Sequence, residues 1–322
     1  MIVRVVPTGL RGFVGRKVLK TVLPYAAVVG LTLTAGAVVV TVNSAGSGAG
    51  DASATGESVS AADAAATESY WTPQAMAQAT PLGERPGKTT GLSALAASGK
   101  TAKAFGGLKT LGVLFFTTST ATKHYCTASV INGGHSNLLI TAAHCLYGSG
   151  GYRQHVAFVP KYNAGAEPYG VWTAKRLTVT SGWRKSRDKD LDFGFIAVNT
   201  RGGKQIATVT GTNVLAINTG YRNWVNVDGY PMVAYAKSDH PIYCRNWTKK
   251  KFTYTREFDC AGYFGGTSGS PFLWHENYST GTGKVVGVIG GYQQGGNVDY
   301  ISYSSIFDKD VWNLRAAAAR TS

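Results

Sequence analysis

Cysteine is scarce in this chain, which has four in 322 residues, and no two of them are separated by only two residues. The Cys-x-x-Cys spacing typical of zinc and thiol redox sites is therefore missing, and we expect no metal and no cofactor. A small and even number of cysteines is typical of an exported protein with two disulfides. The four residues are Cys126, Cys145, Cys244 and Cys260.

Charged residues are also few, at 15% of the chain, whereas glycine occurs 41 times and apolar residues reach 44%. The apolar content indicates a globular body rather than a disordered chain. Many glycines with few charges are typical of a β protein with tight turns. The net charge is nevertheless +15. Because no nucleic-acid motif accompanies the basic runs at 184–187 and 249–251, we interpret them as solvated loops and expect no nucleic-acid partner.

The first 20 residues contain no acidic residue but five basic ones, and a continuous apolar run follows at 21–42. This order is typical of an export signal, so we expect a secreted protein that is cleaved between Ser44 and Ala49. The apolar run is also long enough to span a bilayer. The alternative is therefore an uncleaved membrane anchor at 1–49, with the rest of the protein facing outside.

Residues 50–106 are rich in Ala, Ser, Thr and Gly, which predicts a linker or a pro-segment. They contain one hydrophobic island, Tyr70 to Met76, with the sequence Tyr-Trp-Thr-Pro-Gln-Ala-Met. The island is either a helix start that packs on the body or part of a pro-peptide. The sequence does not separate these two interpretations.

From about residue 107 the chain changes to short runs of β-branched and aromatic residues, which predict strands. These runs lie at 113–118, 126–131, 137–141, 156–159, 170–174, 193–198, 224–227 and 285–289. Only the end of the chain, from about 304 to 320, predicts a helix. Many strands without intervening helices predict an all-β domain built as barrels or a sandwich.

Three segments bring together the residue types that activate a serine. A serine hydroxyl is a poor nucleophile, and it needs a base and a carboxylate that orients the base. His144 in Thr-Ala-Ala-His-Cys is the candidate base. Asp192 is the preferred carboxylate because the Phe-Gly-Phe-Ile that follows it alternates like a strand leaving the core. Asp190 is the alternative, and Asp188 is less favoured.

Ser268 is the candidate nucleophile, in the segment Gly-Gly-Thr-Ser-Gly-Ser-Pro at 265–271. Glycines beside it allow a sharp backbone turn and a close approach of substrate. The backbone amides of Gly266 and Ser268 would then form an oxyanion hole.

The histidine segment resembles the histidine motif of the chymotrypsin/trypsin superfamily of serine peptidases. The serine segment resembles the Gly-Asn-Ser-Gly-Ser-Pro form of bacterial glutamyl endopeptidases more than the Gly-Asp-Ser-Gly-Gly-Pro form of trypsin. The resemblance covers roughly residues 107–316. The whole layout, with the Trp-Thr-Pro island upstream, resembles exported trypsin-like peptidases of actinobacteria.

The resemblance implies two antiparallel six-stranded β-barrels with the active site in the cleft between them. We expect the first barrel at about 107–205, the second at about 206–303 and a C-terminal helix at about 304–320. The resemblance also implies a disulfide between Cys126 and Cys145. We expect the remaining two cysteines to form the second disulfide.

Two departures from the family pattern carry information. Animal enzymes place Asp before the serine, where it pairs with a freed N-terminus, but Thr267 occupies that position here. We therefore predict that the N-terminal ammonium does not activate this protein. The acid of the trypsin pocket is replaced by Gly262, and the glutamyl enzymes' pocket histidine is absent from 285–292. We expect an apolar or broad preference, with a pocket bordered by Gly262, Tyr263, Gly290, Gly291 and Tyr292.

The sequence thus predicts an exported serine endopeptidase that hydrolyses peptide bonds through an acyl-enzyme. We expect a monomer whose partner is a protein or peptide substrate. The alternative is a catalytically silent, peptidase-like module that binds the cell wall or a protein. An esterase of the α/β-hydrolase class is disfavoured, because that class has Gly-x-Ser-x-Gly and a histidine after the serine.

Overall fold

The computed structural model describes residues 50–82, 99–133, 136–231 and 240–322. The predicted export signal and its apolar run lie outside these residues. Within the described ranges, no helix combines the length and apolar character needed to cross a membrane.

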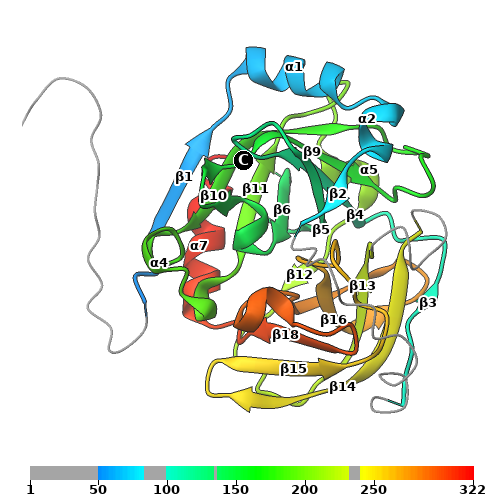
Figure 1. Cartoon of the computed structure of the whole chain (residues 1–322), viewed down its shortest axis with the longest axis vertical. Coiled ribbons are helices and arrows are strands. Elements are labelled where there is room, and N and C mark those ends of the chain that lie inside the picture. The colour runs from blue at the N-terminus through cyan, green and yellow to red at the C-terminus, as the bar shows by residue number, and fades with distance from the viewer. Residues whose placement is uncertain (1–49, 83–98, 134–135, 232–239) are drawn as a thin grey trace, which may run out of the picture. The chain divides into compact units, whose positions relative to one another are not determined.

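The first sheet closes into a six-stranded antiparallel barrel (Figure 1). Its strands are β4 (Leu111–Thr117), β5 (Lys123–Ile131), β6 (Leu138–Thr141), β9 (Gln154–Pro160), β10 (Trp172–Thr180) and β11 (Gly194–Val198). They pair in the order β10-β11-β6-β5-β4-β9, and pairing of β9 with β10 completes the ring. The runs of alternating and β-branched residues therefore predicted each strand of this barrel.

The second sheet has six antiparallel strands in the order β17-β16-β13-β14-β15-β18. These are β13 (Trp224–Gly229), β14 (Ile242–Phe252), β15 (Thr255–Asp259), β16 (Pro271–Asn277), β17 (Thr282–Val288) and β18 (Ile301–Ser305). The two end strands meet where Val288 N–H donates to Ser304 Oγ at 3.1 Å. The predicted mostly-β architecture is confirmed, with one closed barrel and a second sheet.

Short elements complete the described chain. They are β1 (Ala54–Ser58), α1 (Ala61–Tyr70), α2 (Pro73–Ala77), β2 (Thr80–Pro81), β3 (Lys103–Ala104), η1 (Ala143–Cys145), β7 (Tyr147–Gly148), β8 (Gly151–Tyr152), α4 (Ser181–Ser186), η2 (Lys189–Leu191), α5 (Ile206–Thr210), β12 (Val214–Leu215), η3 (Tyr292–Gly295) and α7 (Lys309–Ala319). Two basic runs that the sequence placed in loops lie on regular elements instead. Residues 184–187 fall on and just after α4, and 249–251 lie in β14, although their charged side chains are largely exposed.

A C-terminal helix is present, but α7 begins later than predicted (Figure 1). Ser302 to Ser305 are buried and pair with β15, so this segment extends the sheet instead of starting the helix. The Asp308 carboxylate then caps α7 by accepting from Asp310 N–H at 2.9 Å. Because this cap satisfies an amide at the helix start, the helix starts there rather than at residue 304.

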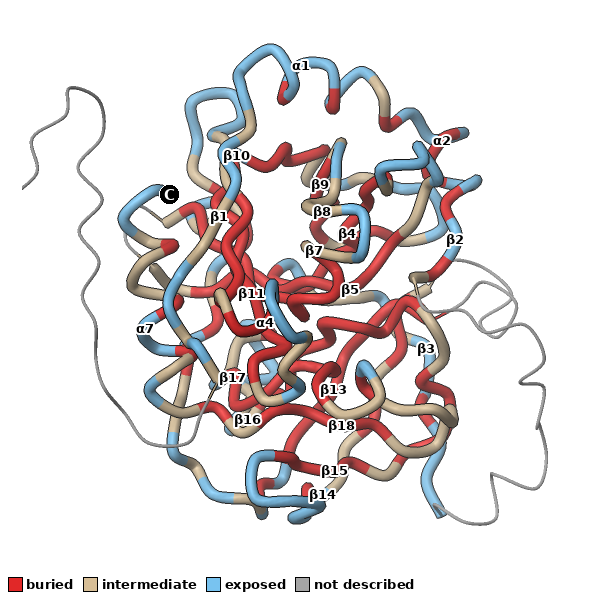
Figure 2. Tube along the Cα trace, turned by 60° about the vertical axis from the view of Figure 1, so that its left-hand side comes forward, coloured by how far each residue is buried: buried red, intermediate tan, exposed pale blue. Residues whose placement is uncertain are grey.

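Both faces of β4 are buried, because residues 50–82 pack on the outside of the barrel. Leu114 and Phe116 point into the barrel core, whereas Phe115 meets Trp71 and Met76. Trp71 is only 2% exposed, and its Nε1 donates to His155 O at 2.5 Å. The hydrophobic island therefore packs on the body as the end of α1 and the start of α2. Figure 2 shows that α1 otherwise keeps an exposed outer face.

Candidate active site

His144 lies on the short 3₁₀ turn η1, directly after β6. The turn is anchored by the disulfide from Cys145 to Cys126 on the neighbouring strand β5. Cys244 and Cys260 form the second disulfide, between β14 and the end of β15. Both expected pairings are thus present. His144 is 4% exposed, so its ring is held in place by its surroundings.

The Asp192 carboxylate holds His144 at two points. Asp192 Oδ1 accepts from the backbone N–H of His144 at 2.9 Å, and Oδ2 lies 2.8 Å from the ring nitrogen Nδ1. The backbone N–H of Gly291 donates to the same Oδ2 at 2.7 Å. Asp192 is 1% exposed. Because a carboxylate accepts hydrogen bonds, this network assigns the proton to Nδ1 and leaves Nε2 as the acceptor.

Asp190, the alternative carboxylate, lies in η2 and makes no hydrogen bond to His144 within the described chain. Its backbone N–H donates to Asp188 Oδ1 at 3.1 Å. Partial burial, followed by the negative charges of Asp188 and Asp308, raises the pKa of Asp190 to about 6. The geometry therefore favours Asp192 over Asp190 as the partner of His144.

Ser268 lies between β15 and β16, on a loop that is hydrogen-bonded to the first barrel. The backbone N–H of Thr127 on β5 donates to Ser268 O at 2.8 Å. The Thr127 hydroxyl donates to Gly266 O at 3.0 Å and accepts from Tyr230 N–H at 3.0 Å. Thr127 thus joins the two sheets at the serine loop. The local sequence around Thr127 does not indicate this role, because the role depends on contacts with segments distant in the chain.

The glycine after Ser268 is required by the backbone and by space. Gly269 has φ +84°, and a Cβ there would collide with Thr141 Oγ1 and Thr127 O. Among the described residues, the Ser268 hydroxyl and the amides of Gly266 and Ser268 have no hydrogen-bond partner within the protein. These groups remain available to a bound molecule. No hydrogen bond between Ser268 Oγ and His144 Nε2 is present, as is common before a substrate brings such a pair together.

The predicted pocket residues fall into separate environments. Gly262 N–H donates to Asp299 Oδ2 at 3.3 Å. Tyr263 is buried in the second sheet, its hydroxyl donates to Val227 O at 2.7 Å, and burial raises its pKa well above the usual value. A Cβ on Gly290 would lie 3.1 Å from Asp192 Oδ2, so Gly290 lies beside the carboxylate to which the Gly291 N–H donates.

Tyr292, the last of the five, opens η3. Its ring packs edge-on against Phe252 and Tyr303, with Lys189 Nζ 5.2 Å from the ring centroid. The Tyr292 ring therefore packs among aromatic neighbours.

One group of residues lies close enough to bind a metal in the part of the chain that the structure describes. It consists of Cys126, His144 and Cys145. Both sulfur atoms are joined in the disulfide, so neither can act as a thiolate ligand.

The chain resembles known peptidases in sequence and in structure. A family model described as Trypsin matches residues 102–308. An extracellular metalloprotease of Bacillus subtilis (strain 168) is 26% identical over 171 residues, covering 50% of this chain and 49% of that protein. The chain thus spans about half the length of the curated relative it matches.

Among solved structures, the protease Anisep from Arthrobacter nicotinovorans is similar, with a TM-score of 0.61 and 26% identity, over 68% of this chain and 100% of that one. A thermostable serine protease AL20 from an extremophilic microorganism has a TM-score of 0.59 at 22% identity, over 66% of this chain and 98% of that one. A Glu endopeptidase in complex with MPD has a TM-score of 0.54 at 18% identity, over 68% of this chain and 97% of that one. At 22% and 18% identity, the last two structures show that the fold is shared and nothing more. Because the family model matches more than half of the residues, the chain belongs to the trypsin family of chymotrypsin-fold peptidases.

Proposed function

We propose that this protein is an exported serine endopeptidase in which Ser268 attacks the peptide bond, His144 takes the proton and Asp192 orients the histidine. The observation that carries the proposal is the double contact of the Asp192 carboxylate with the backbone N–H and the Nδ1 of His144. A buried carboxylate in this position fixes one tautomer and stabilises the imidazolium that forms.

The reaction follows from these positions. Ser268 Oγ attacks the carbonyl carbon as its proton passes to His144 Nε2, and the imidazolium then protonates the leaving amine. This step forms an acyl-enzyme. A water molecule, deprotonated by His144, attacks the ester, and the proton returns to Ser268 as the acid product leaves. Each proton that His144 accepts is therefore donated again within the cycle.

The amides of Gly266 and Ser268 are proposed to hold the negative oxygen that develops in each step. Both amides lack partners in the described chain, which is the condition that an oxyanion hole requires. Removing one such donor typically lowers kcat by about 10²–10³.

Activation by a freed N-terminus is not part of this proposal. Thr267 stands where the animal enzymes have Asp, and its hydroxyl donates locally to Phe264 O at 2.7 Å. A neutral side chain cannot form an ion pair with an ammonium group. Addition of one residue to the mature N-terminus should therefore leave activity intact, and loss of activity from that addition alone would contradict the idea.

Export and substrate preference are also proposed. All four cysteines are in disulfides, which suits an oxidising compartment outside the cytoplasm. No acidic or histidine side chain stands at the positions that give trypsin or the glutamyl enzymes their preference. We therefore expect cleavage after apolar residues or with broad preference, in a monomeric enzyme acting on proteins or peptides.

The test compares wild type, Ser268→Ala and Ser270→Ala with a fluorophosphonate label and a peptide library. Ser270 is a matched control, because it is buried in the same loop and its Oγ has no hydrogen-bond partner among the described residues. We expect label and cleavage with wild type and Ser270→Ala, and neither with Ser268→Ala. Equal cleavage by wild type and Ser268→Ala would show that the site assignment is wrong.

A further inference from the structure

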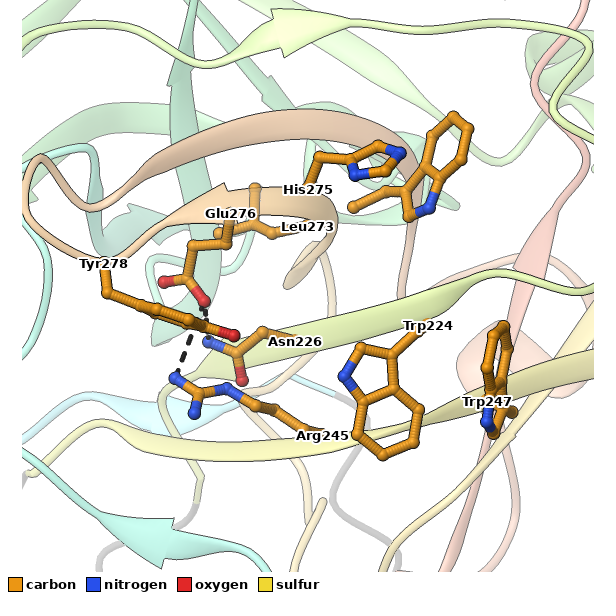
Figure 3. A pocket seen from close by; sticks show the side chains of 9 residues that line it. Trp224, Asn226, Arg245, Trp247, Leu273, His275, Glu276 and Tyr278 are labelled. Carbon is orange, nitrogen blue, oxygen red and sulfur yellow. Dashed lines mark hydrogen bonds and ion pairs between the residues drawn. The ribbon is translucent and has the colours of Figure 1, made fainter.

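A pocket of about 360 Å³ lies on the second sheet, lined by residues of β13, β14 and β16 and by Tyr278 just beyond β16 (Figure 3). Its volume is in the range typical of small-ligand sites. None of the residues assigned above to catalysis lines it. It therefore needs an explanation separate from peptide hydrolysis.

Large aromatic rings form one end of the pocket. Figure 3 shows Trp224 and Trp247 together there. Their ring centroids are 5.5 Å apart, and the angle between the rings is 63°. Trp224 is 38% exposed and Trp247 is 46% exposed. Tryptophan combines a large apolar area with a polar N–H group, so exposed tryptophans that meet at a pocket are suited to binding rather than to the core.

Polar groups with unsatisfied hydrogen-bonding capacity form the other end of the pocket (Figure 3). Asn226 is 5% exposed, and its Nδ2 donates to Glu276 Oε2 at 2.9 Å and to Asp228 Oδ1 at 3.0 Å. Its Oδ1 is buried without a hydrogen-bond partner in the described chain, and so is Nε of Arg245. A ligand hydroxyl that displaces the side-chain contacts covering these two atoms can donate to the first and accept from the second, which would remove both unsatisfied groups.

The charges around the pocket disfavour an ionic ligand of either sign. Lys100 and Arg222 each lie 4.5 Å from a tryptophan ring centroid, over Trp224 and Trp247 respectively. These cations oppose a cationic ligand. At the polar end, the Glu276 carboxylate opposes a phosphate or a carboxylate, and its ion pair with Arg245 at 3.8 Å offsets the attraction of that cation for an anion. The remaining ligand class is neutral, rich in hydroxyls and apolar on one face.

We propose that this pocket binds a neutral sugar ring of a polysaccharide, with the C–H face of the ring on Trp224 or Trp247 and its hydroxyls at Asn226 and Arg245. A sugar ring has hydroxyls at its edge and an apolar C–H face, which matches the two ends of the pocket. Such a site would concentrate the peptidase on a glycan-bearing surface. It is independent of the catalytic assignment.

The test uses the full chain with Ser268→Ala, so that self-digestion does not occur. Binding of N-acetylchitohexaose and cellohexaose is measured by isothermal titration calorimetry, with polyphosphate, a thymidine oligonucleotide and a mixed peptide library as comparison ligands. We expect one neutral hexasaccharide to bind, and Trp224→Ala or Trp247→Ala to weaken binding about tenfold or more. Trp312→Ala is the matched control, because Trp312 is 44% exposed but lies on α7, outside the pocket.

The proposal is overturned if neither hexasaccharide binds at millimolar concentration, or if Trp312→Ala weakens binding as much as Trp224→Ala. It is also overturned if the polyphosphate, the oligonucleotide or the peptides bind in a Trp224-dependent way. Near-ultraviolet circular dichroism reports whether each variant keeps its fold. Hydrolysis of a soluble peptide by Trp224→Ala with Ser268 intact should match wild type, which separates failure of this site from failure of the catalytic assignment.

Discussion

The backbone N–H of Gly291 donates a 2.7 Å hydrogen bond to the carboxylate of Asp192, which in turn holds His144. Gly291 lies three residues after the end of β17 in the second sheet, whereas Asp192 and His144 belong to the first barrel. The orientation of the histidine therefore depends on how the two sheets meet.

Replacement of Gly291 by alanine tests this dependence. Gly291 has φ +78°, and a Cβ would lie 3.0 Å from Lys189 O, so the amide must shift away from Asp192. The backbone strain costs about 1–3 kcal/mol of stability, and we expect kcat to fall at least tenfold as well. Gly203→Ala is the control, because Gly203 has φ +71° with nothing within 4 Å. Equal activity of the two variants would contradict a role for the Gly291 amide. Thermal unfolding and steady-state kinetics measure the two effects.

Thr127→Val should destabilise the serine loop without changing side-chain volume. The valine leaves Gly266 O and Tyr230 N–H without the hydroxyl that now bonds both. Two buried groups without partners cost roughly 2–4 kcal/mol of unfolding free energy. We also expect kcat/KM to fall at least tenfold, because a small displacement of the loop misplaces Ser268. Denaturant unfolding and peptide hydrolysis provide the measurements. Thr127→Ser keeps the hydroxyl and should remain near wild type, so a defect of similar size in both variants would rule out the hydrogen bonds as the cause.

Asp190→Asn should stabilise the protein at high pH and not at low pH. The folded-state pKa of Asp190 is raised from 3.8 to about 6 by burial and by nearby carboxylates. The folded protein therefore binds this proton more tightly than the unfolded chain, and the resulting stability is present below pH 3.8 and lost as pH rises through about 6. Because Asp190 is only half-buried, solvent screening reduces the gain at pH 8 to about 1 kcal/mol. Thermal unfolding at pH 3.5 and pH 8 measures it, and an equal gain at both values would exclude titration of Asp190 as the cause.

Trp71→Ala should loosen the part of residues 50–82 that follows β1, because β1 itself stays paired with β10. The indole is buried against Phe115 and donates to His155 O. Loss of a buried tryptophan typically costs about 3–5 kcal/mol, so the segment should be cut faster by an added protease. The experiment uses the full chain with Ser268→Ala, so that the segment is present, and follows limited proteolysis by mass spectrometry. The exposed Trp312→Ala serves as the control, and unchanged cleavage of Trp71→Ala would mean that other contacts hold the segment.

The sequence predicted a strand correctly where the strand itself contains a run of β-branched and aromatic residues. Val113 to Thr118 has a run of β-branched and aromatic residues, and it forms β4. The strands β14, β15, β16 and β18 carry no such run. In β14, Lys249 and Lys251 both pair with Glu257 on β15, so the basic run is stabilised by its cross-strand neighbour. A partner that lies on another strand is invisible to a pattern of single residues.

The residue types of the site and their order can be seen in the sequence: a histidine before a cysteine, a carboxylate before a strand, and a serine between glycines. It also indicated the first barrel, because local alternation encodes a strand and its buried face. Three features become visible in the folded protein alone: which carboxylate contacts His144, how Gly291 and Thr127 hold the site together, and that exposed tryptophans of different strands share a pocket. These contacts join residues distant in the chain, and their geometry depends on the register and packing of two sheets rather than on any local pattern.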